Sequence, residues 1–220
     1  MQLTALPVTV PGVASGAARN PQLGEIMRMI RKLPAVVLAL AMAAGPLAAM
    51  TLEGIRIPDR MAVDSVTLSL NGAGVRSKFF IEVYVACLYL EAPSEDPVAI
   101  LTADEPQAVT LHITSKLVTR EKLAKAARKG MLKATGGDLE PIRAQFERFM
   151  RVFDAEVSKG DVFRLVYVPG SGTRVTKNNR NLDTVPGLAF KKALFGIWLS
   201  EDPTEQDLKE SMLKTRTAST

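Results

Sequence analysis

From Met50 onward, hydrophobic residues in the first half of the chain either alternate with polar ones or form short apolar runs, as in β-strands. These runs are rich in β-branched and aromatic residues, and turn-forming Pro-Asp, Asn-Gly-Ala-Gly and Pro-Ser-Glu-Asp-Pro groups separate them. The predicted strands are LEGIRIP, VTLSLNG, KFFIEVYVACLYLE and QAVTLHIT, with a short helix in PVAILTAD between the last two.

From Thr119 the hydrophobic period becomes helical, and Thr119 is a plausible N-cap. This helix is predicted to end near Gly136, and a second helix begins near Pro141. Strands return in DVFRLVYVPG, GTRVTKN and NLDTVPG, and helices follow in the stripe from Phe190 to Trp198 and in TEQDLKESMLK. This order predicts an α+β domain in which an antiparallel sheet carries helices on one face.

The segment before this domain has the layout of a secretory signal peptide. Residues 27–49 read as a basic start, an apolar run from Leu33 to Ala44 and a small-residue cleavage site ending near Ala49. The run is shorter than the roughly 20 residues of a membrane-spanning helix. Residues 1–26 lack this pattern, so we expect translation to start at Met27 or Met29. The predicted organisation is then a domain over 50–215 and a tail over 216–220, in a periplasmic or secreted protein.

The charge of the chain gives little support for a nucleic-acid partner. The chain has 28 basic and 23 acidic residues. Four of the basic residues and one of the acidic residues lie in the first 49 positions, so the rest of the chain has 24 basic and 22 acidic residues. A nearly neutral domain lacks the basic surface that binds nucleic acid. The single cysteine, Cys87, forms no disulfide within the chain and is predicted to be buried.

We expect no cofactor and no metal site. His112 is the single histidine of the chain, so a metal site with two histidine ligands is excluded. The sequence also has no phosphate-binding loop, dinucleotide fingerprint or nucleophile elbow. Basic residues crowd the helix after Thr119, from Lys116 to Lys133, with Glu121 as their one acidic neighbour in that span. Two interpretations stay open: a solvated helix face, or weak contact with an anionic membrane surface or acidic partner.

The segment LNGAGVRSKFFIEVYVACLYLE is the most informative part of the chain. If it continues as one strand, Phe79, Ile81, Val83, Val85 and Cys87 share a core face, and the opposite face carries Arg76, Lys78, Glu82 and Tyr84. A guanidinium and a phenol beside an apolar surface would suit an amphipathic carboxylate. Arg76 and Tyr84 are therefore the candidate ligand-binding residues, and Gly72 to Gly74 are expected to form the bend that aims Arg76.

This segment resembles the chalcone isomerase-like family, in particular its bacterial, exported branch. IRIPDR, KGDVFRLVYVPGSGTRV and VPGLAFKKALFGIWLSEDP extend the resemblance over Leu52 to Leu213. It implies an open-faced β-sandwich, in which helices pack on a large antiparallel sheet with a ligand cleft between them. In the plant enzymes an arginine supports the developing enolate, and it matches Arg76; the other polar positions fall at Tyr84 and near Val118, Thr119, Lys125 and Gly196.

The resemblance leaves the function open between alternatives. Relatives that bind fatty acids have an arginine and a tyrosine at the positions of Arg76 and Tyr84, which implies a monomeric protein that binds a fatty acid or a similar carboxylate. For both side chains to reach one ligand, the chain must turn or bulge between Gly74 and Phe79. The alternatives are an isomerase or intramolecular lyase acting through catalytic Arg76, and an interaction domain for an envelope partner.

Overall fold

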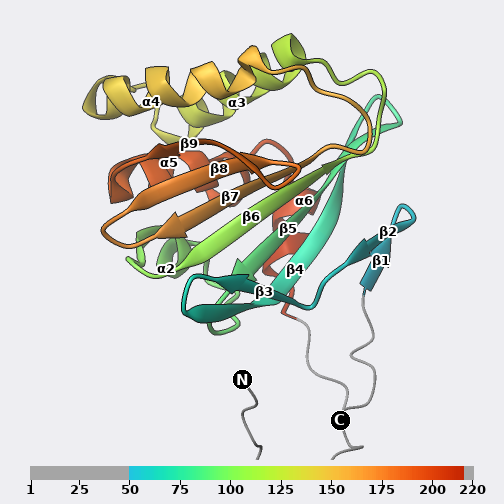
Figure 1. Cartoon of the computed structure of the whole chain (residues 1–220), viewed down its shortest axis with the longest axis horizontal. Helices are drawn as coiled ribbons and strands as arrows, with labels where there is room; N and C mark the ends of the chain where they lie inside the picture. Colours follow the sequence, from blue (N-terminus) through green and yellow to red (C-terminus); the bar gives the residue numbers. More distant parts are fainter. Residues whose placement is uncertain (1–49, 216–220) are drawn as a thin grey trace, which may run out of the picture. The chain divides into compact units, whose positions relative to one another are not determined.

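We analysed a computed structural model of the 220-residue chain, which describes residues 50–215. The predicted signal peptide, the segment before it and the tail lie outside these residues. Seven antiparallel strands form the main sheet, and each pairs with its neighbour in the sequence (Figure 1). The strands are β3 (Arg60–Val63), β4 (Val66–Lys78), β5 (Ile81–Leu90), β6 (Gln107–Ile113), β7 (Val162–Val168), β8 (Gly172–Lys177) and β9 (Arg180–Val185). The predicted α+β class with a large antiparallel sheet is confirmed.

Most of the helical residues pack against one face of this sheet. The helices are α2 (Pro97–Thr102), α3 (Arg120–Ala134), α4 (Arg143–Met150), α5 (Leu188–Leu199) and α6 (Gln206–Leu213), with short 3-10 turns η2 (Glu140–Ile142) and η3 (Arg151–Asp154). Helix α5 is buried on nearly every side because it contacts α2, α3, α6 and β8. Hydrophobic residues occur on all sides of α5, which is typical of a helix in the centre of a protein.

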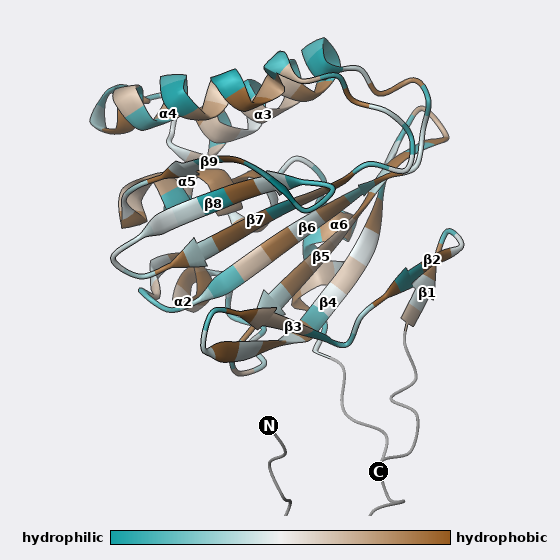
Figure 2. Cartoon of the chain, in the orientation of Figure 1, coloured by the Kyte–Doolittle hydropathy of each residue, from teal (hydrophilic) through white to brown (hydrophobic). Residues whose placement is uncertain are grey.

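The opposite face of the sheet is also covered. A separate two-stranded sheet, β1 (Met50–Leu52) and β2 (Ile55–Ile57), contributes to a second hydrophobic cluster there with Val85, Cys87 and Tyr89 of β5. The predicted strand LEGIRIP is therefore two strands, because Glu53 and Gly54 turn the chain with positive φ angles. Figure 2 shows the brown, hydrophobic positions that run along the central strands between these layers.

The predicted strand KFFIEVYVACLYLE is interrupted near its start. Phe79 and Phe80 form a tight turn with φ angles of 49° and 63°, and they join β4 to β5. Their side chains are exposed, so the prediction that Phe79 and Ile81 belong to the core face was wrong. The sequence pattern misled because large aromatic residues rarely occupy a turn that requires positive φ.

The bend expected at Gly72 to Gly74 is a register shift inside β4, between Leu70 and Gly72, and the two glycines have a second role. Both lie inside β4, under helix α6. A Cβ atom on Gly72 would lie 2.4 Å from the Ser211 carbonyl oxygen, which is closer than real Cβ contacts. The buried Asn71 side chain reinforces this contact by donating to the Met212 carbonyl oxygen over 3.0 Å. These glycines therefore let a helix approach the sheet closely.

Local signals in the helical half were read correctly. The Thr119 side chain caps α3 by accepting a hydrogen bond from the Lys122 amide, and α3 ends just before Gly136, whose φ is positive. Helix α2 lies in the predicted position after the N-cap Asp96. Between residues 50 and 215, no helix is both long and apolar enough to cross a membrane.

Candidate functional site

The turn at Phe79 and Phe80 brings Arg76 directly opposite Tyr84 in the β4–β5 ladder. The register shifts after this pair, since Ser77 faces Glu82 and Val83 is the extra residue of a β-bulge. The guanidinium carbon of Arg76 lies 5.4 Å from the centre of the Tyr84 ring. The turn that a site shared by Arg76 and Tyr84 needs is thus present, but it lies at Phe79 and Phe80, after Arg76 and before the bulge residue Val83.

Tyr84 is held by a residue from a distant element. Trp198 of α5 donates its indole N–H to the Tyr84 hydroxyl oxygen over 2.9 Å, in a buried position. Burial raises the pKa of Tyr84, while the charge of Arg76 acts in the opposite direction. The phenol therefore stays protonated near neutral pH, and its own O–H can donate because the tryptophan uses only an acceptor site.

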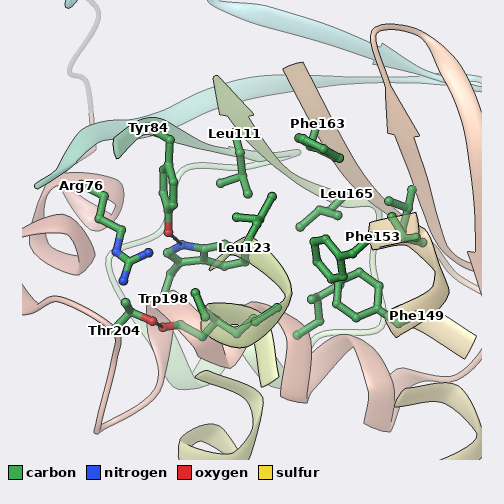
Figure 3. Close-up of a pocket in the computed structure, with 16 residues that line it drawn as sticks. Arg76, Tyr84, Leu111, Leu123, Phe149, Phe153, Phe163, Leu165, Trp198 and Thr204 are labelled. Atoms are coloured by element: carbon green, nitrogen blue, oxygen red, sulfur yellow. Dashed lines mark hydrogen bonds between the residues drawn. The ribbon is translucent and has the colours of Figure 1, made fainter. Parts of the chain in front are cut away.

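Arg76 and Tyr84 both line one end of a cavity between the sheet and the helices (Figure 3). Apolar side chains from β6, β7, β8, α3, α4, η3 and α5 line the rest, apart from Thr204. They include Leu111, Leu123, Phe149, Phe153, Phe163 and Trp198. Arg76 is partly exposed, so the polar end of the cavity is the end that meets solvent. This is the arrangement of a site for an amphipathic molecule.

The cavity is narrow. Its total empty volume, including the part open to solvent, is about 520 Å³, but only about 40 Å³ is available to the centres of water-sized molecules. Small-molecule sites typically have about 300 to 1,000 Å³. The smaller figure describes the enclosed space, because the larger one also counts space that is open to solvent. A long ligand tail would have to displace lining side chains.

Glu205 lies beside the polar end of the cavity, and sequence reasoning missed it. It precedes α6, and its carboxylate accepts a hydrogen bond from the Ser77 amide. Burial raises the pKa of Glu205, and the Ser77 hydrogen bond and the Arg76 charge oppose this shift. Arg76 therefore already has an internal counter-charge nearby. Neither Glu205 nor Trp198 could be placed by strand periodicity, because both come from segments far along the chain.

The remaining polar positions suggested by the resemblance lie away from the cavity. Lys125 is exposed on α3, and its neighbour Ala126 lines the cavity instead. Likewise Ile197 lines it, whereas Gly196 faces a second groove beside α2 and the end of α3. Thr119 is occupied as the cap of α3. Arg76 and Tyr84 are thus the two sequence-derived candidates that the fold brings together.

Several basic residues of α3 have partners within the molecule. Lys133 forms an ion pair with Asp202, Arg120 contacts Glu121 and Glu156, and the guanidinium of Arg128 lies over the ring of Phe146. His112 lies within 3.3 Å of the Thr110 hydroxyl and lines neither cavity. Across residues 50–215, the His, Cys, Asp and Glu side chains form no group of three that could hold a metal.

Comparison with known proteins agrees with this architecture. Thirty-six chains of solved structures match, among them an Arabidopsis thaliana fatty-acid binding protein with 16% identity and a TM-score of 0.61. That match covers 76% of this chain and 96% of the plant protein, and it establishes a shared fold. A search of curated protein sequences gave no significant match. The family model described as chalcone isomerase-like matches residues 49–214, and the chain therefore belongs to the chalcone isomerase-like family.

Proposed function

We propose that this protein binds a fatty acid or a similar amphipathic carboxylate in the cavity beneath α3 and α5. The carboxylate would contact Arg76 and Tyr84, and the tail would extend among the apolar side chains. One observation carries the proposal: Arg76 and Tyr84 are cross-strand partners at the polar end of a lining that is otherwise almost entirely apolar. The fatty-acid binding of the Arabidopsis thaliana protein with this fold supports the same ligand class.

The head-group chemistry supports a carboxylate. A guanidinium can donate two parallel hydrogen bonds to a carboxylate, and such charge-assisted bonds are about twice as strong as neutral ones. Tyr84 can add a third donor, because its hydroxyl oxygen accepts from Trp198 while its proton is free to point elsewhere. The partial exposure of Arg76 would let a charged head group remain close to water while the tail is buried.

The tail would need more room than the cavity now has. The available volume of about 40 Å³ suits a few water molecules rather than an alkyl chain. Ligand entry would therefore separate α3 and η3 from the sheet side of the cavity, where Leu123, Val152 and Phe153 meet Phe163 and Leu165. Hydrogen exchange of α3 and η3 with and without ligand would detect this opening.

Binding is tested by titrating delipidated protein with dodecanoate and hexadecanoate in a calorimeter. Arg76→Gln should weaken binding by about 10- to 100-fold, because hydrogen bonds to a charged group contribute about 1.5 to 3 kcal/mol. Arg174→Gln is the matched control, since Arg174 is a partly exposed arginine of β8 that pairs with Asp64 and does not line the cavity. Methyl dodecanoate should bind weakly to the native protein and show no further loss in Arg76→Gln.

Two results would overturn this proposal. The first is a delipidated native protein that binds neither acid. The second is equal affinity of native protein and Arg76→Gln for dodecanoate. Conversion of a chalcone to a flavanone by the native protein, abolished in Arg76→Gln, would instead identify the isomerase alternative.

We also propose that the protein is exported, on the basis of the signal-peptide pattern in residues 27–49. Mass spectrometry of the protein recovered from the periplasm or medium should give an N-terminus close to Met50. A mature protein that begins at Met1 would contradict both the proposed start and the proposed cleavage.

A further inference from the structure

The tip of the β4–β5 hairpin carries two exposed aromatic side chains next to each other. Phe79 is 83% exposed and Phe80 is 105% exposed, so neither ring is covered by the fold. The one ring contact at the tip comes from the preceding residue, as the Lys78 ammonium lies 5.6 Å from the centre of the Phe79 ring. Packing within residues 50–215 therefore does not account for either phenylalanine.

Backbone conformation does not account for them either. Both residues have positive φ, which a two-residue hairpin turn of this type requires. Asn and Gly are favoured in such turns, and a bulky aromatic residue with positive φ is an outlier. Two phenylalanines thus occupy positions where they strain the backbone and expose apolar surface. Such a combination points to an external apolar contact.

Further apolar surface lies beside this tip. Ile81 is 41% exposed at the start of β5, and Leu117 is 56% exposed in the loop between β6 and α3. The two segments are adjacent, because the Thr114 amide donates to the Val83 carbonyl oxygen over 3.1 Å. Figure 2 shows the brown hairpin tip at the same end of the molecule as this loop. The hairpin tip and the 115–117 loop therefore form one protruding end.

Basic side chains accompany the apolar ones. Lys78 stands over Phe79, Lys116 precedes Leu117, and the Lys122 ammonium donates to the Leu117 carbonyl oxygen over 2.8 Å. Two acidic residues, Glu82 just after the tip and Glu53, also lie close together, and Lys159 near them carries the opposite charge. Exposed aromatic rings with lysines beside them suit the boundary of an anionic bilayer, where the rings enter the head-group region and the ammonium groups meet phosphates.

We propose that the Phe79–Phe80 tip inserts into the surface of an anionic phospholipid membrane. A membrane fits better than a protein partner, because a specific protein interface needs about 800 Å² of complementary surface on each side. A narrow tip with two projecting rings does not offer such a surface, whereas a bilayer deforms around protruding side chains. The lysines supply the charge complementarity for anionic lipids.

The position of the tip relative to the cavity gives this contact a role. Arg76 precedes Phe79 by three residues and Tyr84 follows Phe80 by four, so the polar end of the cavity lies roughly 10 Å along the strands from the tip. A docked tip would hold the cavity entrance close to the lipid head groups. The membrane contact itself does not depend on which ligand the cavity takes.

Vesicle flotation with the delipidated protein tests this proposal. Vesicles of phosphatidylcholine with 30 to 40% phosphatidylglycerol are compared with pure phosphatidylcholine at about 0.05 and 0.3 M salt, a range over which screening of surface charges changes strongly. The central variant is Phe79→Asn with Phe80→Gly, because Asn-Gly suits this turn and keeps the hairpin folded. The binding of this variant to anionic vesicles should fall about tenfold or more, since it lacks the two rings that would be buried in the bilayer.

Three further variants sharpen the experiment. Phe79→Leu with Phe80→Leu should retain most of the binding, because the tip stays apolar. Val98→Ser removes a 62% exposed apolar residue of α2, away from the tip, and should change nothing. Phe80→Trp should show a blue-shifted fluorescence component with anionic vesicles, against the constant signal of the buried Trp198.

Three outcomes would overturn the proposal. Native protein that floats with neither vesicle type has no such contact. Equal flotation of native protein and the Asn-Gly variant would place the contact elsewhere, for example on the basic face of α3. Self-association of native protein that the Asn-Gly variant abolishes, without lipid binding, would make the tip a protein interface. None of these results measures fatty-acid affinity, so they stand apart from the ligand titration.

Discussion

Trp198 and Tyr84, which are 114 residues apart in the sequence, meet through a buried hydrogen bond of 2.9 Å from the indole N–H to the phenol oxygen. The bond joins helix α5 to strand β5 at the polar end of the cavity. It fixes the direction of the Tyr84 side chain beside Arg76, and it leaves the phenol proton available for a ligand. The head-group site therefore depends on a helix that the strand pattern cannot reveal.

Trp198→Phe should test this coupling. The change leaves a buried phenol oxygen without its donor, so we expect the free energy of unfolding to fall by about 1 to 3 kcal/mol. Chemical denaturation measures this loss, and calorimetry should show weaker dodecanoate binding. In a double-mutant cycle, Tyr84→Phe with Trp198→Phe should cost less than the sum of the single changes. Strict additivity would mean that the bond contributes nothing.

Glu205 should make ligand affinity depend on pH. Its pKa is raised mainly by burial, so its negative charge beside Arg76 develops as the pH rises through that raised value. The charge competes with an incoming carboxylate, and dodecanoate affinity should therefore fall as the pH rises through the raised pKa of Glu205. Glu205→Gln should bind more tightly at pH 7.5 and lose most of this dependence. Parallel pH profiles for the two proteins would contradict a role for Glu205.

The same residue should affect stability with a defined sign. Because the pKa of Glu205 is higher in the folded state, its contribution to stability is fully present below its ordinary value of 4.5 and is lost as the pH rises through the folded value. Glu205→Gln should therefore unfold at a higher denaturant concentration than native protein at pH 7, with a smaller difference at pH 4. A less stable glutamine variant at pH 7 would show that the hydrogen bond from Ser77 outweighs burial.

Gly72→Ala should be more destabilising than Gly74→Ala. The added methyl group at Gly72 meets the backbone carbonyls of Ser211 and Met212, which cannot move without shifting α6. At Gly74 it meets the Ser211 Cβ atom, which is fixed to the α6 backbone, and the end of the Leu208 side chain, which can rotate. We expect losses of about 3 and about 2 kcal/mol in the free energy of unfolding, within the usual range for overpacking. A reversed order in denaturant titrations would mean that α6 is loosely packed.

The Asn-Gly variant of the hairpin tip should be more stable than native protein. Replacing Phe79 and Phe80 relieves two strained positive-φ positions and removes no core contact. The expected gain is about 1 kcal/mol, because the greater freedom of glycine in the unfolded chain offsets part of the relief. Denaturant unfolding measures this gain as a shift of the midpoint, with the dependence of the unfolding free energy on denaturant concentration unchanged. A loss of stability would show that the rings pack against the protein.

Elements with local signals were predictable from the sequence. Thr119 marks the start of α3 because its hydroxyl caps the helix, and the β-branched and aromatic residues of β6 and β7 indicate strands. The family resemblance supplied Arg76 and Tyr84 as candidates. In contrast, the turn at Phe79 and Phe80 was missed because these residues are poor turn formers. The approach of α6 to Gly72 was missed because glycine at a bend and glycine under a helix look alike in sequence.

The sequence by itself determined the α+β class and the order of most elements, although it missed β3, because these depend on periodicity and capping. Its short motifs and the family resemblance made Arg76 and Tyr84 candidates. Tertiary structure alone decided that the two residues are cross-strand partners, since this depends on the position of one turn and one bulge. It also decided that Trp198 and Glu205 join them, because contacts between distant segments depend on how helices pack on the sheet. A shift of one residue in the hairpin register would turn Arg76 away from the cavity, since neighbouring strand residues face opposite sides.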